Sequence, residues 1–261
     1  LSKLQAAYSV SQLTADEEAN SQKSQEAGEP AATFDFVKEI DDFERREESL
    51  AQKQEILIQN EDVLAEETLP KFLQETRQMT GAARGTLYHW LFEHFDFNGN
   101  LREQLAYFVK QKQISEEERK KIRIGDFEHF IETKLGQKVR QAIKEELYHR
   151  EMPFILGVPA AEMLKRQAFD YKLSDQELSE YVSVQGVIDA WIDDEDGIIL
   201  IDFKTDHKPD ELTESVFEEC LKKRYQVQLD YYRQALEQMT KKKVKQVILY
   251  SVSLGKGIEC V

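Results

Sequence analysis

Residues 185–189 read Gln-Gly-Val-Ile-Asp, and residues 197–206 read Gly-Ile-Ile-Leu-Ile-Asp-Phe-Lys-Thr-Asp, with an acidic segment between them. The step Asp196-Gly197 between two apolar runs is typical of a tight β-hairpin. Residues 198–201 are apolar at every position, which favours a strand buried on both faces. This stretch therefore predicts an antiparallel hairpin whose second strand lies in the centre of a sheet.

The hairpin is expected to bring two carboxylates together. If its turn is centred between Glu195 and Asp196, Asp189 lies opposite Asp202, with Cβ atoms about 4.5–5.5 Å apart. A slip of one residue would break this pairing. Facing carboxylates destabilise a sheet unless a hard cation such as Mg²⁺, which takes oxygen ligands, lies between them. Lys204 points to the same face as Asp202, where an ammonium can hold an attacking water or balance charge growing on a phosphate. The alternative is a surface hairpin with a Lys–Asp ion pair of little energetic value.

Along the rest of the chain, helical segments come first and strands later. Residues 14–33 are small and polar, as in a linker, and residues 34–68 carry a helical apolar stripe that needs a partner surface. Helices are predicted, in chain order, at about 85–95, at 101–112, from a capping box at Ser115, at 127–135 with Gly136 as its end, and at 218–239. Strands are predicted at 148–156, 181–192, 197–205 and 245–254. A helix that crosses between strands favours an α/β or α+β domain.

Residues 186–189, Gly-Val-Ile-Asp, followed by residues 201–206, Ile-Asp-Phe-Lys-Thr-Asp, resemble the active-site signature of the RecB-family nucleases in the PD-(D/E)XK superfamily. The resemblance covers most of the chain and is best from about Leu69 to the end. It implies an α/β fold with a restriction-endonuclease-like core, in which helices flank a mixed central sheet. The implied domains are a helical or linker extension at 1–68, packing on or preceding the core, and a nuclease domain at 69–261.

The resemblance also implies a set of metal ligands. Asp189 and Asp202 bind Mg²⁺, the carbonyl of Phe203 adds a ligand, and Lys204 is catalytic. Mn²⁺ or Ca²⁺ can replace Mg²⁺ in binding. The commoner family form has Tyr where this chain has Phe203. Because the side chain of Phe203 is expected to point away from Asp202 and Lys204, no loss of activity is expected from this difference.

Two further segments match the family before the hairpin. Residues 85–89, Gly-Thr-Leu-Tyr-His, resemble the motif that opens the domain with a metal-binding histidine, so His89 is the next predicted ligand. The alternative for His89 is a histidine that packs in the core. Residues 150–154, Arg-Glu-Met-Pro-Phe, resemble a family strand. In that strand the carboxylate of Glu151 lines the cleft, orients Lys204 or pairs with Arg150.

A third segment follows the hairpin. The spacing Tyr225-x-x-Gln228-x-x-x-Tyr232 puts the three named side chains on one helical face. In RecB-type nucleases this motif lies beside the metal site and helps to hold the DNA or the active-site residues. The resemblance therefore predicts catalytic roles for Gln228 and Tyr232, and a lesser one for Tyr225. Packing alone is the alternative for the aromatic positions.

Composition restricts the partners. With 35 Lys and Arg against 50 Asp and Glu, the formal net charge is −15, which repels phosphate over the whole surface. Contact with DNA must then be local, at basic clusters that are otherwise solvated faces, or be supplied by another chain. The clusters are Lys120, Lys121 and Arg123; Lys222, Lys223 and Arg224; and Lys241, Lys242, Lys243 and Lys245. Two cysteines exclude a disulfide framework and a four-cysteine iron–sulfur cluster.

The combined reading is a Mg²⁺-dependent exonuclease domain. The resemblance implies that it cuts a single DNA strand delivered by a helicase, during repair of double-strand breaks by recombination, with AddB (RexB) as partner. The chain starts with Leu and has no Walker loop, so ATP is expected only in a motor region outside it. No apolar run approaches the roughly 18 residues of a membrane helix, and a cytoplasmic location in a bacterium is expected. The alternative is a nuclease-like module without catalysis that binds DNA or docks another protein.

Overall fold

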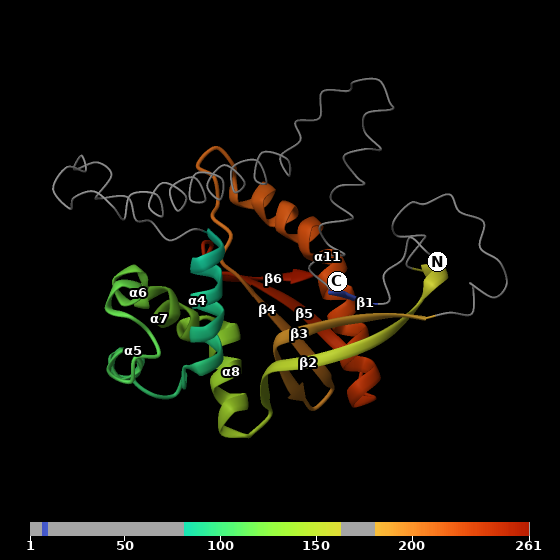
Figure 1. Cartoon of the computed structure of the whole chain (residues 1–261), viewed down its shortest axis with the longest axis horizontal. Coiled ribbons are helices and arrows are strands. Elements are labelled where there is room, and N and C mark those ends of the chain that lie inside the picture. The colour runs from blue at the N-terminus through green and yellow to red at the C-terminus, as the bar shows by residue number, and fades with distance from the viewer. Residues whose placement is uncertain (1–6, 10–80, 163–180, 261) are drawn as a thin grey trace, which may run out of the picture.

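A mixed six-stranded sheet forms the centre of the fold (Figure 1). The computed structural model describes residues 7–9, 81–162 and 181–260. β3 pairs antiparallel with β2 and β4, β4 pairs parallel with β5, β5 pairs antiparallel with β6, and β1 pairs parallel with β3. The strands are β1 (Ala7–Ser9), β2 (Tyr148–Pro159), β3 (Tyr181–Asp194), β4 (Gly197–Lys204), β5 (Val244–Ser251) and β6 (Lys256–Cys260). The mixed α/β sheet expected from the sequence is confirmed.

The β3–β4 hairpin has the predicted turn and register. Asp194 pairs with Gly197, so Glu195 and Asp196 form the turn, and each later pair follows without a slip. Gly197 has φ +136°, and a Cβ there would lie 2.6 Å from the carbonyl oxygen of Lys243. Glycine is therefore needed both for the backbone angle and for this close approach. All eight residues of β4 are buried, as expected of a central strand.

Helices pack against both faces of the sheet. They are α4 (Gly81–His94), α5 (Leu101–Lys110), α6 (Glu116–Lys121), α7 (Ile124–Glu132), α8 (Lys134–Lys144) and α11 (Glu214–Thr240). Figure 1 shows α4 to α8 grouped together and α11 apart from them. Phe203 belongs to the core cluster under α4 to α8, and its ring stacks on Phe92 at 3.9 Å between centroids. Leu200 belongs to the cluster under α11. The side chain of Phe203 thus points into the core, as predicted.

Helix ends follow their capping residues. The predicted capping box is present, with Ser115 and Glu118 bonding each other's backbone N–H groups at the start of α6. The prediction that Gly136 ends a helix was wrong. Thr133 caps a new helix, α8, and Gly136 lies in its first turn. A Cβ at Gly136 would meet the carbonyl oxygen of Phe130 at 1.9 Å, so this glycine allows two helices to join closely.

The amino-terminal part adds one strand to the sheet. Residues 7–9 pair with residues 183–185 of β3. The extension predicted at 1–68 lies otherwise outside the described residues. None of the helices in the described ranges is long and apolar enough to span a membrane.

Candidate active site

Three carboxylates lie side by side across the centre of the sheet. β2 pairs with β3 at the rows just before and just after Glu151, which puts Glu151 level with Asp189. On the other side of β3, Ala190 pairs with Ile201, which puts Asp202 level with Asp189 one row further along. Strands 4.7–4.9 Å apart hold such a row together through the backbone. The carboxylates therefore come from β2, β3 and β4, and their alignment follows from two strand registers.

The backbone is strained within this row. Glu151 has φ +45°, in the left-handed region that residues other than glycine rarely adopt. Conformations of this kind cost on the order of 1–3 kcal/mol and persist only where the surrounding structure enforces them. Such strain is concentrated at functional sites, and here it accompanies the carboxylate of Glu151.

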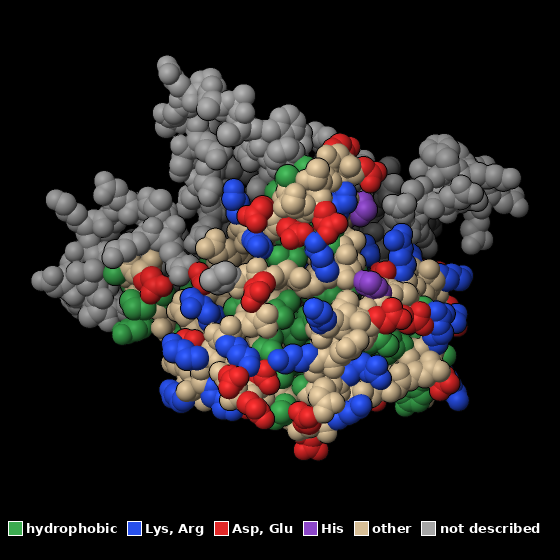
Figure 2. Space-filling view, turned by 180° about the vertical axis from the view of Figure 1, so that it is seen from behind, with side chains coloured by type: hydrophobic (Ala, Val, Ile, Leu, Met, Phe, Trp, Pro, Cys, Tyr) green, Lys and Arg blue, Asp and Glu red, His purple; other side chains and the backbone are tan. Residues whose placement is uncertain are grey.

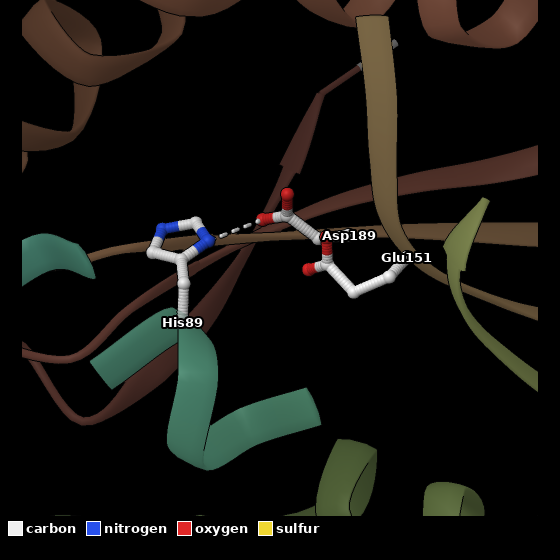
Figure 3. Close-up of side chains that lie close together, drawn as sticks. All are labelled: His89, Glu151 and Asp189. Carbon is white, nitrogen blue, oxygen red and sulfur yellow. Dashed lines mark ion pairs between the residues drawn. The ribbon is translucent and has the colours of Figure 1, made fainter. Parts of the chain in front are cut away.

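Helix α4 brings a histidine to the same row. The Nδ1 atom of His89 lies 3.3 Å from Oδ2 of Asp189. One ligand atom each from His89, Glu151 and Asp189 lie within 4.8 Å of one another, so these three side chains could hold a metal ion (Figure 3). The sequence prediction included His89 and Asp189 in the ligand set but left Glu151 among three open roles.

Asp202 lies beside this group and is fully buried. Its Oδ1 accepts a hydrogen bond from Nζ of Lys204 at 3.0 Å. Its Oδ2 lies 2.9 Å from the same Nζ, but it is a buried oxygen without a hydrogen-bond partner. An orphaned carboxylate oxygen inside a protein is costly unless a further cation or donor satisfies it. This oxygen fits the prediction that Asp202 is a metal ligand, because it keeps one coordination position open.

Phe203 contributes through its backbone. Its N–H donates to Oδ2 of Asp189 at 2.9 Å. In an extended strand the N–H and C=O of one residue point to the same side, so the Phe203 carbonyl also faces β3. That direction is compatible with the predicted carbonyl ligand.

The charges of the site perturb one another. Burial first, and then the negative charges of Asp189 and Glu93, raise the pKa of Glu151 to about 7. Burial opposes the charged form of His89, but its contact with Asp189 outweighs this effect and raises the pKa of His89. Burial also raises the pKa of Asp202, with Asp189 adding to the effect and Lys204 opposing it. Protons thus partly neutralise the metal-free site, and a divalent cation would take their place.

Two residues of the predicted motif on α11 face the carboxylates. Nε2 of Gln228 donates to the hydroxyl oxygen of Tyr232 at 2.7 Å. Burial first, and then the charges of Asp202 and Asp189, raise the pKa of Tyr232, so its hydroxyl keeps its proton. Because the Tyr232 oxygen already accepts from Gln228, the phenolic proton can be donated to a group bound in the site.

Sequence reasoning gave too little weight to Arg150. Its guanidinium donates to the backbone carbonyl of Glu93 at the end of α4, and is thus directed away from pairing with Glu151. It also lies over two aromatic rings, 4.9 Å from the centroid of Tyr148 and 5.5 Å from that of Phe97. Arg150 therefore ties the helix that carries His89 to the strand that carries Glu151. Its place next to Glu151 in the sequence was the only local signal.

The chain is similar in sequence to known nucleases. The profile of the PD-(D/E)XK nuclease superfamily matches residues 61–257. An ATP-dependent helicase/nuclease protein of Lachnoclostridium phytofermentans, named as one subunit of its enzyme, is 35% identical over 225 residues, which cover 75% of this chain and 16% of that protein. Proteins with the same name from Thermoanaerobacter sp. and Alkaliphilus oremlandii are 31% and 33% identical, over 73% and 72% of this chain. The match covers 15% of the length of each of these two relatives.

Proposed function

The chain belongs to the PD-(D/E)XK nuclease superfamily, and from this premise we propose that it is a metal-dependent deoxyribonuclease domain. The observation that carries the proposal is the alignment of Glu151, Asp189 and Asp202 across three neighbouring strands, with His89 on one side and Lys204 on the other. Carboxylate-rich oxygen sites suit Mg²⁺, and Mn²⁺ accepts the added imidazole readily. Ca²⁺ is expected to bind in the same place.

The residues present fit such an ion. His89, Glu151 and Asp189 would hold it, with the free Oδ2 of Asp202 and the Phe203 carbonyl on the adjoining strand. When bound, the ion supplies Lewis-acid stabilisation of the phosphate and makes a water molecule a better nucleophile. No side chain needs to form a covalent intermediate in this reaction.

The protein's own groups have separate tasks in phosphodiester hydrolysis. Burial works against the ammonium form of Lys204, but the carboxylates of Asp202 and Asp189 outweigh it and raise its pKa, so the side chain stays cationic. As a cation in a water-poor site, Lys204 stabilises charge that develops on the phosphate oxygens. Tyr232, oriented by Gln228, donates its proton in a hydrogen bond to the same group.

The finer proposal concerns the substrate and the larger protein. The relatives are named helicase/nuclease subunits, and this chain matches about 15% of their length. We infer that the domain cuts one strand of DNA as an exonuclease, after a helicase in the same polypeptide has unwound the duplex with ATP. Acting in the bacterial cytoplasm with AddB (RexB), the complete protein, of the AddA (RexA) type, would prepare double-strand breaks for recombination.

The surface charge supports delivery of the strand rather than capture. The net charge is −15, and Figure 2 shows Lys and Arg side chains interspersed with Asp and Glu instead of gathered in one field. A protein with such a surface gains little from counterion release on DNA. We therefore expect weak binding of DNA by this chain alone at physiological salt.

The test is cleavage of an end-labelled single-stranded oligonucleotide by the chain with Mg²⁺ or Mn²⁺. Asp202→Asn and Lys204→Met should each lower the single-turnover rate by at least roughly a hundredfold, because each removes charge from the reacting centre. Asp210→Asn is the matched control, since Asp210 is an exposed aspartate on the loop after β4. Circular dichroism and the unfolding midpoint establish that each variant is folded.

The rival function is a module that binds DNA or docks another protein without catalysis. The unpartnered buried oxygen of Asp202 and the strained backbone of Glu151 argue against it, because a docking module has no use for either. The rival would be favoured if the wild-type chain failed to cleave with either ion at high protein concentration, alone and with the motor and AddB. Equal rates for the wild type and Asp202→Asn would also exclude catalysis at this site.

A further inference from the structure

Asp206, the last residue of the carboxylate stretch, has no task in the mechanism above, yet it is buried and bonded. Its Oδ1 accepts a hydrogen bond from the Tyr225 hydroxyl at 2.8 Å. The same oxygen lies 3.2 Å from Nη1 of Arg224, and the side chains of Asp206 and Arg224 are only 7% and 17% exposed. Asp206 thus joins the loop after β4 to the first half of α11, and it fixes the position of the Tyr225 ring.

The Tyr225 ring in turn lies against the ammonium of Lys204. Nζ of Lys204 is 4.5 Å from the ring centroid. The side chain of Lys204 is 11% exposed, so this cation–π contact is largely shielded from water, where such contacts are strongest. On its other side the same Nζ contacts Asp202 at 2.9 Å. The ammonium is therefore held between a carboxylate and an aromatic face.

The two holders respond differently to a bound cation. A metal ion on Asp202 takes up part of the carboxylate charge and weakens its attraction for Lys204. The face of Tyr225 carries no net charge and, as part of a ring, offers no carboxylate oxygen to the metal. The aromatic contact therefore persists when the ion pair with Asp202 is loosened.

We propose that Tyr225, fixed by Asp206, is a positioning residue that keeps the Lys204 ammonium directed into the active site while Asp202 is engaged by a metal ion. The inference rests on the proposed nuclease function and adds to it. It assigns Tyr225 a larger part than the sequence motif suggested. Neither Tyr225 nor Asp206 needs to touch the substrate for this role.

The first test is kinetic and uses the full chain with Mn²⁺ and single-stranded DNA. Tyr225→Leu removes the ring face and should lower the single-turnover rate roughly tenfold, equivalent to about 1.4 kcal/mol, with KM little changed. Tyr225→Phe keeps the ring and should restore most of the rate, with Asp206→Asn between the two. Tyr107→Leu, at an exposed tyrosine on α5, is the matched control and should behave as wild type.

A double-mutant cycle asks whether Tyr225 acts through Lys204. In a Lys204→Met background, Tyr225→Leu should have no further effect on the residual rate, because the group that the ring positions is gone. A further tenfold loss in that background would overturn the proposal. Equal losses for Tyr225→Phe and Tyr225→Leu would overturn it too, since the ring face would then be irrelevant.

The second test does not depend on activity. Side-chain NMR should show the ε-methylene protons of Lys204 shifted upfield by the ring current of Tyr225, in the wild type and in Tyr225→Phe but not in Tyr225→Leu. The shift should persist when Ca²⁺ occupies the site, and its loss on adding Ca²⁺ would refute the proposed role. A wild-type chain that cleaves, with Tyr225→Leu equally fast, contradicts this inference alone. An inactive wild type contradicts the proposed function instead.

Discussion

Replacement of Glu151 by Gln should make the metal-free protein more stable at alkaline pH and make the metal-bound protein less stable. In the folded, metal-free state the pKa of Glu151 is raised from the ordinary 4.5 to about 7, mainly by burial and then by the charges of Asp189 and Glu93. Between these two pH values the folded protein holds more protons than the unfolded chain. The free energy of unfolding therefore falls as pH rises through this window.

The structure sets the size of this effect. The difference between a pKa of about 7 and 4.5, at 1.36 kcal/mol per pH unit, gives an upper limit of about 3 kcal/mol above pH 7. The side chain of Glu151 is only half-buried, so solvent screening lowers the expected value to about 1–2 kcal/mol. Glutamine has nearly the same shape and no charge, so it removes this penalty without opening a cavity.

The measurement is urea unfolding of the wild type and Glu151→Gln, in EDTA and in Ca²⁺, at pH 4.5 and pH 8. In EDTA the variant should be more stable by about 1–2 kcal/mol at pH 8 and nearly equal to the wild type at pH 4.5. In saturating Ca²⁺ the order should reverse, because the wild type gains binding free energy that a site without this carboxylate cannot match. Glu132→Gln, at an exposed glutamate at the end of α7, is the control.

Two results would refute the reasoning. If Glu151→Gln were no more stable than the wild type at pH 8 in EDTA, the carboxylate would carry no electrostatic penalty in the folded protein. If Ca²⁺ stabilised both proteins equally, Glu151 would not belong to the metal site. A gain in stability at both pH values would indicate relief of backbone strain instead of charge.

Other substitutions probe the support of the site. Gly136→Ala should destabilise the protein by about 3 kcal/mol, because its Cβ would meet the Phe130 carbonyl oxygen at 1.9 Å; Gly125→Ala, with nothing within 4 Å, should be neutral or slightly stabilising in thermal unfolding. Arg150→Met should weaken Mn²⁺ binding by roughly 10–100-fold in calorimetry, because it frees the end of α4 and with it His89. The raised pKa of His89 means that metal must displace a proton, so Mn²⁺ affinity should rise with pH by up to about tenfold per unit until His89 is neutral, and flat affinity between pH 6 and 8 would contradict this.

Local pattern carried much of the site. The acidic two-residue turn and the apolar run of β4 were enough to predict the register that puts Asp202 level with Asp189. The same alternation placed the Phe203 side chain in the core, where it stacks on Phe92. These predictions succeeded because the two strands are joined by a tight turn, which leaves one register that buries the apolar residues.

Gly136 shows where local pattern misleads. A glycine after a helical segment usually marks its end, but here it lies in the first turn of the next helix. The reason is the approach of the Phe130 carbonyl oxygen, which belongs to the preceding helix. The capping hydroxyl of Thr133 gave the true boundary and was the signal to weigh more heavily.

The sequence by itself determined the central hairpin, the pairing of Asp189 with Asp202 and the direction of Lys204, because spacing along a strand and across a tight turn is a local property. Only the tertiary structure decided that His89 contacts Asp189, that Glu151 completes the row and that Tyr225 lies over Lys204. These contacts depend on how α4, β2 and α11 pack on the sheet. That packing is set by the shapes of many buried side chains at once, and no short spacing in the sequence encodes it.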